Sequence, residues 1–208
     1  GAGTGGRQHL LRLPAGEVTI RYTAPAEPVS ELAEPVNGLA EPVNGLAEPV
    51  SELARIIALR PSRYCPADRL AGFAATTFGH LTADLDRVRA VADYVHAHLA
   101  YEVGASGPTT DAAETLLTGQ GVCRDFAHLT ATLCRALGVP ARVAAVYAPG
   151  LSPMDFHLVT EAAVDGGWYV WDSTRLAPRR SLLRIATGRD AADVAFATIL
   201  DGRVTMTG

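Results

Sequence analysis

The chain has 208 residues, of which 48% are hydrophobic, and its formal net charge is −4. This length and this mixture of charges are typical of one soluble globular domain that can bury a core. The negative charge gives no reason to expect a nucleic acid or an anionic membrane as a partner, and the apolar runs are too short and too interrupted to span a bilayer.

Three cysteines are present, Cys65, Cys123 and Cys134, and their spacing is not paired. Such a set predicts neither a disulfide framework nor a zinc site. No N-terminal stretch has the charged, apolar and small-residue order of a signal peptide. We therefore expect a cytoplasmic protein that needs neither a metal nor an organic cofactor.

Residues 1–25 open with a glycine-rich run, and two short segments with strand character follow at 10–13 and 17–22. In the second, Val18, Ile20 and Tyr22 alternate with polar residues, which is the period of a strand. Two short strands are not stable alone. We interpret 1–25 as a short β remnant, which either pairs with a later part of the chain or is what is left of a larger β element.

Residues 26–53 are four tandem copies of a seven-residue unit, of which the middle two read AEPVNGL and the outer two AEPVSEL. A coiled coil is excluded because each copy carries a proline within the unit, at Pro28, Pro35, Pro42 and Pro49. We interpret the segment as an extended linker with turns. A docking surface for a partner is the alternative, and neither interpretation gives the segment a chemical role.

Residues 54–208 have the pattern of a compact α/β domain that begins with helices. Pro66 favours the start of a helix that runs to about residue 78. Thr82 is a plausible N-cap for the next helix, whose apolar stripe ends at Leu99. Asp111, with Glu114 three residues later, predicts a short third helix.

Cys123 follows the glycine break of Gly119 and Gly121 and comes at the head of an amphipathic helix predicted over 124–137. Gly138 then ends that helix. The N–H groups and the positive dipole end of a helix N-terminus favour a thiolate over a thiol. The sequence thus predicts that Cys123 is a nucleophile.

Strands are predicted after the helices, at 141–147, 156–164, 168–172 and 181–186, while 191–200 is a short helix or a strand. Asp165, Gly166 and Gly167 separate the second and third strands and indicate a hairpin. Helices first and antiparallel strands later predict an α+β fold, with the Cys123 helix packed on the sheet.

A cysteine nucleophile needs a base, and the base needs a group that orients it. His157 and Asp172 stand at neighbouring ends of the predicted hairpin. A two-residue turn would pair Val159 with Asp172 and make His157 and Asp172 diagonal neighbours on one face. A three-residue loop without a bulge would put them on opposite faces.

Other residues of similar type have structural interpretations. Cys65 and Cys134 are expected to be small buried side chains, and His128 to support packing or hydrogen bonding. Arg124 and Asp125 are expected to cap the helix start and to pair with each other.

Three ordered motifs, GVCRDFAH from Gly121, Asp155-Phe156-His157 and WYVWDST from Trp168, resemble the bacterial transglutaminase-like superfamily. The resemblance covers roughly residues 59–200. It implies a papain-like α+β core in which Cys123 is the nucleophile, His157 the base and Asp172 the orienting carboxylate.

The resulting hypothesis is acyl transfer from an amide of a protein or peptide substrate, through a thioester on Cys123. The backbone N–H of Cys123 is one expected oxyanion donor; Gln120 and the indoles of Trp168 and Trp171 are candidates for the second. Hydrolysis by a cysteine peptidase or amidase is the close alternative to transamidation. A non-catalytic module of the same fold that binds peptide is a further one.

Overall fold

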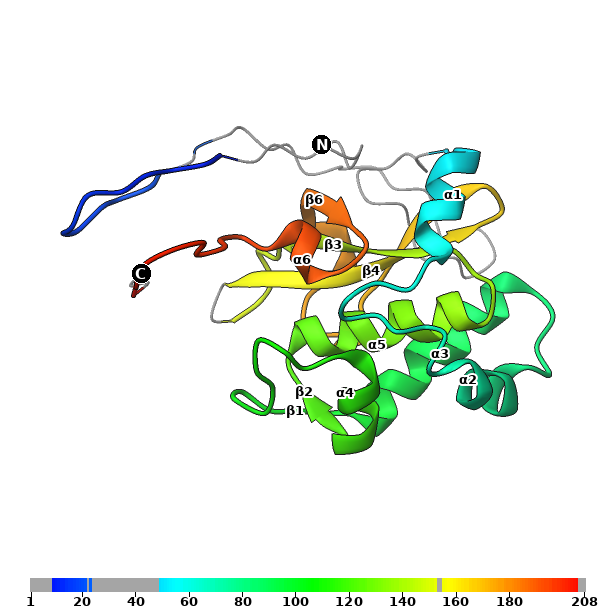
Figure 1. The fold of residues 1–208 in the computed structure, drawn as a ribbon. Helices are drawn as coiled ribbons and strands as arrows, with labels where there is room; N and C mark the ends of the chain where they lie inside the picture. The colour runs from blue at the N-terminus through cyan, green and yellow to red at the C-terminus, as the bar shows by residue number, and fades with distance from the viewer. Residues whose placement is uncertain (1–8, 22, 24–48, 153–154, 206–208) are drawn as a thin grey trace.

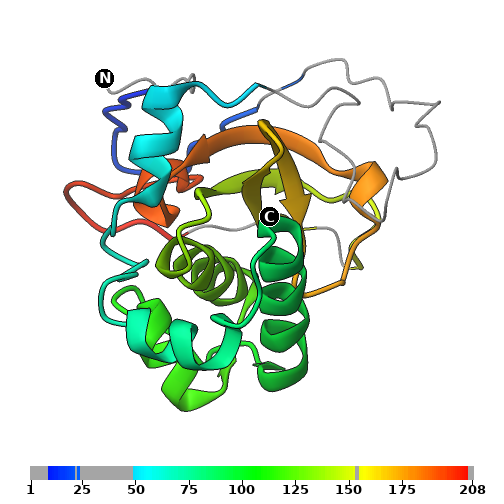
Figure 2. The same ribbon diagram turned by 90° about the vertical axis from the view of Figure 1, so that its right-hand side faces the viewer.

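A computed structural model describes residues 9–21, 23, 49–152 and 155–205. Its main body is a four-stranded sheet with helices on both sides. In Figures 1 and 2, α2, α3, α4 and α5 gather on one side of the sheet, and α1 lies on the other. The helices are α1 (Glu52–Leu59), α2 (Ala71–Phe78), α3 (Asp84–His98), α4 (Ala112–Thr118), α5 (Cys123–Ala136) and α6 (Ala191–Val194).

The large sheet has the strand order β5-β4-β3-β6, and all its pairs are antiparallel. These strands are β3 (Ala141–Tyr147), β4 (Phe156–Val164), β5 (Gly167–Trp171) and β6 (Leu183–Gly188). A second, two-stranded parallel sheet joins β1 (Ala100–Tyr101) to β2 (Gln120–Gly121). The α+β class predicted from the sequence is confirmed.

Helix α5 packs against the middle of the large sheet, chiefly on β4. Leu129 and Leu133 of α5 share one buried core with Leu158 and Ala162 of β4. The Thr160 hydroxyl also donates a hydrogen bond of 3.0 Å to the carbonyl oxygen of Ala127. This contact fixes the first half of α5 along β4, so the helix N-terminus is held in a defined place beside the sheet.

The hairpin between β4 and β5 has the two-residue turn that the sequence analysis required. Val164 pairs with Gly167 and Thr160 with Trp171, so no residue is inserted between the strands. Asp165 and Gly166 both have positive φ, 48° and 80°, as the tight hairpin turn with two left-handed residues demands. This register places Asp172 directly after β5, opposite the start of β4.

Several helix boundaries differ from those predicted. Helix α2 begins at Ala71 because residues 67–70 form turns after Pro66. Helix α3 has Ala83 rather than Thr82 at its N-cap, without a side-chain hydrogen bond. The predicted cap of α4 is confirmed, since Asp111 accepts hydrogen bonds from the N–H groups of Ala113 and Glu114.

The C-terminal elements are also shifted from their predicted places. Residues 179–181 form a 3₁₀ turn, so β6 begins at Leu183, two residues later than expected, and pairs with β3. The unassigned segment 191–200 contains the short helix α6 and then no regular element. Asp190 caps α6 by accepting a hydrogen bond from the N–H of Ala192.

The two strands predicted in the N-terminal segment are not found among its described residues, 9–21 and 23. Leu10 and Ile20 are largely exposed, at 77% and 67%. Alternation alone does not make a strand, because a strand needs a partner to satisfy its backbone groups.

Most of the repeat segment lies outside the described residues. Its last copy is described from Pro49, whose backbone forms a bridge with Gly167, and helix α1 starts within it with Ser51 as the N-cap. The sequence analysis missed this helix start. Among the described residues, no helix combines the length and apolar character that a membrane span would require.

Candidate active site

Cys123 is the first residue of α5 and is partly exposed. Its neighbour Asp125 is fully buried and holds the turn before it: the carboxylate accepts hydrogen bonds from the N–H of Val122 at 2.9 Å and from the Ser106 hydroxyl at 2.5 Å. Arg124 donates to the other carboxylate oxygen. The predicted capping and pairing roles of Arg124 and Asp125 are confirmed.

Gly121 is required by this arrangement. A Cβ atom at position 121 would come within 2.6 Å of the Asp125 Cβ atom, closer than real Cβ contacts allow. Gly119 has a positive φ of 67° and ends α4, so both glycines beside Gln120 have a structural reason. Together they bring the chain out of α4, through β2, and into the first turn of α5.

Tyr101 is a neighbour of Cys123 that the sequence analysis missed. Parallel pairing of β1 with β2 places Tyr101 opposite Gly121, and its ring lies 5.9 Å from that of Phe126 in the first turn of α5. Burial is the main cause that raises the pKa of Tyr101, and the neighbouring side chain of Cys123 acts in the same direction. A phenolic hydroxyl therefore lies near the thiol of Cys123.

His157 and Asp172 lie on neighbouring strands and form a buried pair. The His157 Nε2 atom is 3.0 Å from an Asp172 carboxylate oxygen. The other Asp172 oxygen accepts hydrogen bonds from the hydroxyl of Thr174 at 2.7 Å and from its N–H at 3.0 Å. Asp172 is therefore fixed by groups other than the imidazole, which lets it set the imidazole's orientation.

The electrostatics of this pair favour a charged imidazolium. Burial lowers the pKa of His157, but the hydrogen bond with Asp172, the charge of Asp172 and the neighbouring Cys123 outweigh burial and raise that pKa to about 9. Burial raises the pKa of Asp172, but His157 and Thr174 lower it overall. The Nδ1 atom of His157 has no hydrogen-bond partner among the described residues, and the thiol of Cys123 is near enough to affect the pKa of the ring.

The remaining cysteines and His128 have the structural surroundings expected of them. Cys65 and Cys134 are fully buried, and burial raises the pKa of both, that of Cys134 to about 12. His128 stacks on Tyr64 and accepts a hydrogen bond of 3.0 Å from the N–H of Ala191. Burial is the main cause that lowers the pKa of His128 to about 4.

The three expected candidates for a second oxyanion donor lie in different places. Trp168 pairs with Ala163 near the turn of the hairpin, at the end of the strands opposite to His157. Trp171 is buried and lines a cavity beside Asp172. Gln120 is exposed on β2. Over the described ranges, no cluster of three or more potential ligands could hold a metal ion.

Residues 71–173 match the sequence model of the transglutaminase-like superfamily, a range that includes Cys123, His157 and Asp172. The chain belongs to this superfamily. It is similar to a candidate cysteine protease from Cytophaga hutchinsonii of known crystal structure, with 46% identity and a TM-score of 0.66 over 67% of this chain and 48% of that one.

Two further relatives of the transglutaminase-like chain are more distant. The uncharacterized protein ML0607 of Mycobacterium leprae is 28% identical over 148 residues, 66% of this chain and 52% of that protein. The periplasmic domain of TgpA from Pseudomonas aeruginosa, crystallised with ethylmercury, is 24% identical, with a TM-score of 0.50 over 63% of this chain and 52% of that one; this likeness concerns the fold alone. The chain thus spans about half the length of these relatives.

Proposed function

We propose that this transglutaminase-like chain is a thiol enzyme that cleaves peptide or carboxamide bonds through Cys123, His157 and Asp172. The observation that carries the proposal is the buried ion pair of His157 with Asp172 at 3.0 Å, next to a partly exposed cysteine at a helix N-terminus. A nucleophile, a base and a group that orients the base are the three parts that such chemistry needs.

The first half-reaction starts from a thiolate and an imidazolium. Cys123 Sγ attacks the carbonyl carbon, and the carbonyl oxygen becomes an oxyanion. The carbon–nitrogen bond then breaks as His157 gives its proton to the departing amine, leaving a thioester on Cys123. Asp172, held by Thr174, keeps the ring oriented and favours its charged form.

In the second half-reaction, neutral His157 takes a proton from water or from an amine, which attacks the thioester carbon. The carbon–sulfur bond breaks, and thiolate and imidazolium are restored. The backbone N–H of Cys123 and the hydroxyl of Tyr101 are the proposed donors to the oxyanion in both steps. Tyr101 is proposed for this role because its phenol lies near the thiol of Cys123, which together with burial raises the phenol's pKa.

Water is the acceptor that the comparisons favour. The relative from Cytophaga hutchinsonii, at 46% identity, is described as a candidate cysteine protease. The chain itself has no lysine, so it offers no side-chain amine for cross-linking to another copy. We therefore propose hydrolysis of a protein or peptide substrate as the main outcome, with transfer to a primary amine as the second candidate.

The proposal is tested by the rate at which iodoacetamide alkylates Cys123, measured by mass spectrometry across the pH range in the wild type and in His157→Gln. Cys65 and Cys134 are internal controls, because they are buried and burial raises their pKa. We expect Cys123 to react faster than free cysteine at neutral pH, and His157→Gln to abolish the advantage. Reaction no faster than free cysteine in both proteins would refute the enzyme assignment.

Hydrolysis and transamidation are separated by the products from a peptide library with and without a primary amine. A thioester trapped on Cys123 identifies the side chain or bond that is attacked, and Cys123→Ser is the control. Incorporation of the amine above the level of hydrolysis would assign the transferase function instead.

A further inference from the structure

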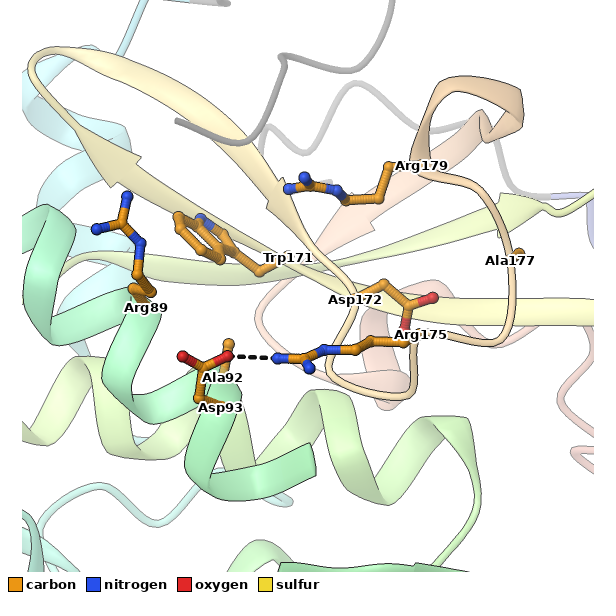
Figure 3. A pocket seen from close by; sticks show the side chains of 8 residues that line it. All are labelled: Arg89, Ala92, Asp93, Trp171, Asp172, Arg175, Ala177 and Arg179. Atoms are coloured by element: carbon orange, nitrogen blue, oxygen red, sulfur yellow. Dashed lines mark hydrogen bonds and ion pairs between the residues drawn. The ribbon is translucent and has the colours of Figure 1, made fainter. Parts of the chain in front are cut away.

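A cavity of about 460 Å³ lies beside the C-terminal end of β5, between that strand, α3 and the loop that follows β5 (Figure 3). Cys123 and His157 are not among the described residues that line it. Among the residues expected to be catalytic, only Asp172 lines the cavity. Its polar lining consists of Arg89 and Asp93 of α3, Trp171 and Asp172 of the strand end, and Arg175 and Arg179 of the loop.

The indole N–H of Trp171 is a hydrogen-bond donor that has no acceptor among the described residues. The residue is only 8% exposed. Buried donors are nearly always paired, and an exception needs a physical explanation. In Figure 3 the indole ring lies between the side chains of Arg89 and Arg179. An acceptor at this position would be shared by the indole and by guanidinium groups.

The lining offers donor groups to a ligand that accepts hydrogen bonds. Three guanidinium groups lie beside two carboxylates, and both carboxylates are turned to partners within the protein. Asp93 is paired with Arg175 (Figure 3), and Asp172 is turned to His157.

The arginines of the lining can donate to a ligand and to the protein at the same time. Arg179 donates to the Val170 carbonyl at 3.4 Å, and Arg89 lies 3.7 Å from Asp86. A guanidinium carries five N–H groups. Both side chains can therefore keep contacts within the protein and still bind an acceptor in the cavity.

We propose that this cavity binds a carboxylate group, which accepts hydrogen bonds from the Trp171 Nε1–H and from the guanidinium groups of Arg89 and Arg179. Arginine recognises a planar carboxylate through two parallel hydrogen bonds. The carboxylate has two possible sources: a small free acid, or a polypeptide, which in terms of the proposed function would be a substrate.

The test follows the indole N–H signals of the full chain by ¹⁵N NMR during titration with sodium acetate at constant ionic strength. The chain carries Cys123→Ala, so that binding is measured without the thiol chemistry. Trp168 and Trp171 are the only tryptophans, and Trp168→Phe assigns the two signals. We expect a saturable downfield shift of the Trp171 proton, because it gains a hydrogen bond, and no shift for Trp168.

Two arginine variants separate a specific site from general ionic effects. Arg179→Gln removes a charge from the lining and should weaken acetate binding by about tenfold; Arg89→Gln is a second test should the first variant fail to fold. Arg55→Gln, on the exposed surface of α1, is the matched control and should leave the affinity unchanged. Loss of affinity in all three variants would point to non-specific screening and would overturn the proposal.

The ligand classes are distinguished by parallel titrations with phosphate, with an acetylated peptide that has a free C-terminal carboxylate, and with its amidated form. Tighter binding of the free-carboxylate peptide than of acetate assigns a polypeptide ligand, and equal binding assigns a small acid. A shift that does not saturate, or phosphate bound more tightly than acetate, refutes the carboxylate site. Neither result affects Cys123 alkylation in the wild type, so failure here and failure of the proposed enzyme function are distinguishable.

Discussion

Two buried histidines, His157 on β4 and His128 on α5, differ in what their Nε2 atoms contact. His157 Nε2 faces the Asp172 carboxylate at 3.0 Å, whereas His128 Nε2 accepts a hydrogen bond from the backbone N–H of Ala191. The first contact requires a proton on Nε2, and the second requires a lone pair. The pKa of His157 is accordingly raised to about 9, and that of His128 is lowered to about 4.

Burial acts in the same direction on both rings, because removal from water disfavours the charged imidazolium. The sign of the net pKa shift is therefore set by the polar neighbours of each ring, which for His157 are Asp172 first and then Cys123. We infer that a buried histidine of this fold is a candidate general acid or general base only where a carboxylate contacts its ring. His128, which is closer to Cys123 in the sequence, is excluded by this criterion, and His157 is selected.

The largest expected effect comes from the same substitution at the two positions. His157→Gln should slow Cys123-dependent cleavage by about 10²-fold or more, because the general acid and base is lost. His128→Gln keeps an acceptor for the Ala191 N–H, so activity should stay within about threefold of the wild type, which marks a residue outside the chemistry.

Turnover of a peptide identified by thioester trapping measures both effects, and circular dichroism checks that each variant folds. Equal losses of activity in two folded variants would remove the distinction between the histidines.

The carboxylates beside the two histidines give the next largest effect. Asp172→Asn keeps the shape of the side chain but removes its charge, so we expect turnover to fall by about tenfold to a hundredfold and the pKa of His157 to move down from about 9. Asp190→Asn is the matched control: Asp190 contacts the N–H groups of Tyr64 and Ala192, and asparagine caps helices equally well.

The pKa is measured by NMR titration of the His157 ring in each variant. An Asp172→Asn protein whose His157 still titrates near the wild-type value would show that the carboxylate is not the cause of the shift.

Features that follow from local chain chemistry are predictable from the sequence. The hairpin register depends on the positive φ of Asp165 and Gly166, which the Asp-Gly-Gly pattern indicates. The start of α5 depends on two glycines and an apolar stripe. Both are local signals, so the approach of His157 to Asp172 can be inferred from the residues alone.

Features that depend on distant pairing are not predictable in this way. Tyr101 reaches Cys123 through a two-residue parallel pairing of β1 with β2, which is too short for a periodic pattern. Its only sequence signal is an aromatic residue directly after the apolar stripe that ends at Leu99. The strands predicted at 10–13 and 17–22 failed for the opposite reason: the alternation is present, but no partner strand pairs with the described residues.

Tyr101 is a further neighbour of the Cys123 thiol, and its substitution gives a smaller expected effect. Tyr101→Phe removes one proposed oxyanion donor and keeps the ring against Phe126, so we expect turnover to fall by about tenfold while KM stays nearly unchanged. Alkylation of Cys123 should keep its rate, since it forms no oxyanion.

Tyr147→Phe, at a partly exposed ring on β3, is the matched control. A parallel loss of alkylation and turnover in Tyr101→Phe would assign Tyr101 a positioning role instead.

The last expected effect concerns stability rather than turnover: it is a pH dependence in which the two histidines act on opposite sides of neutrality. The native pKa of His128, about 4, lies below the unfolded value near 6.5. The unfolded chain therefore binds more protons between these values, and the free energy of unfolding falls as the pH drops through them, by on the order of 3 kcal/mol. The native pKa of His157, about 9, lies above the unfolded value, so its contribution is present below about 6.5 and is lost as the pH rises through 9.

Urea unfolding over this pH range should thus show a maximum of stability near the unfolded pKa of histidine. His128→Gln should flatten the acid side of the maximum, and His157→Gln should flatten the decline between about pH 6.5 and 8.5, each without changing the other. Above about pH 8.5 the buried thiols of Cys65 and Cys134, whose pKa values are raised, add a decline of their own. The carboxyl groups Asp172 and Asp193, whose pKa values are lowered, stabilise the native state above about pH 4 and lose this contribution only below it, so their titration falls outside both windows. An unchanged decline between about pH 6.5 and 8.5 in His157→Gln would show that the imidazolium of His157 does not stabilise the native state. The electrostatic difference between the two histidines would then be refuted.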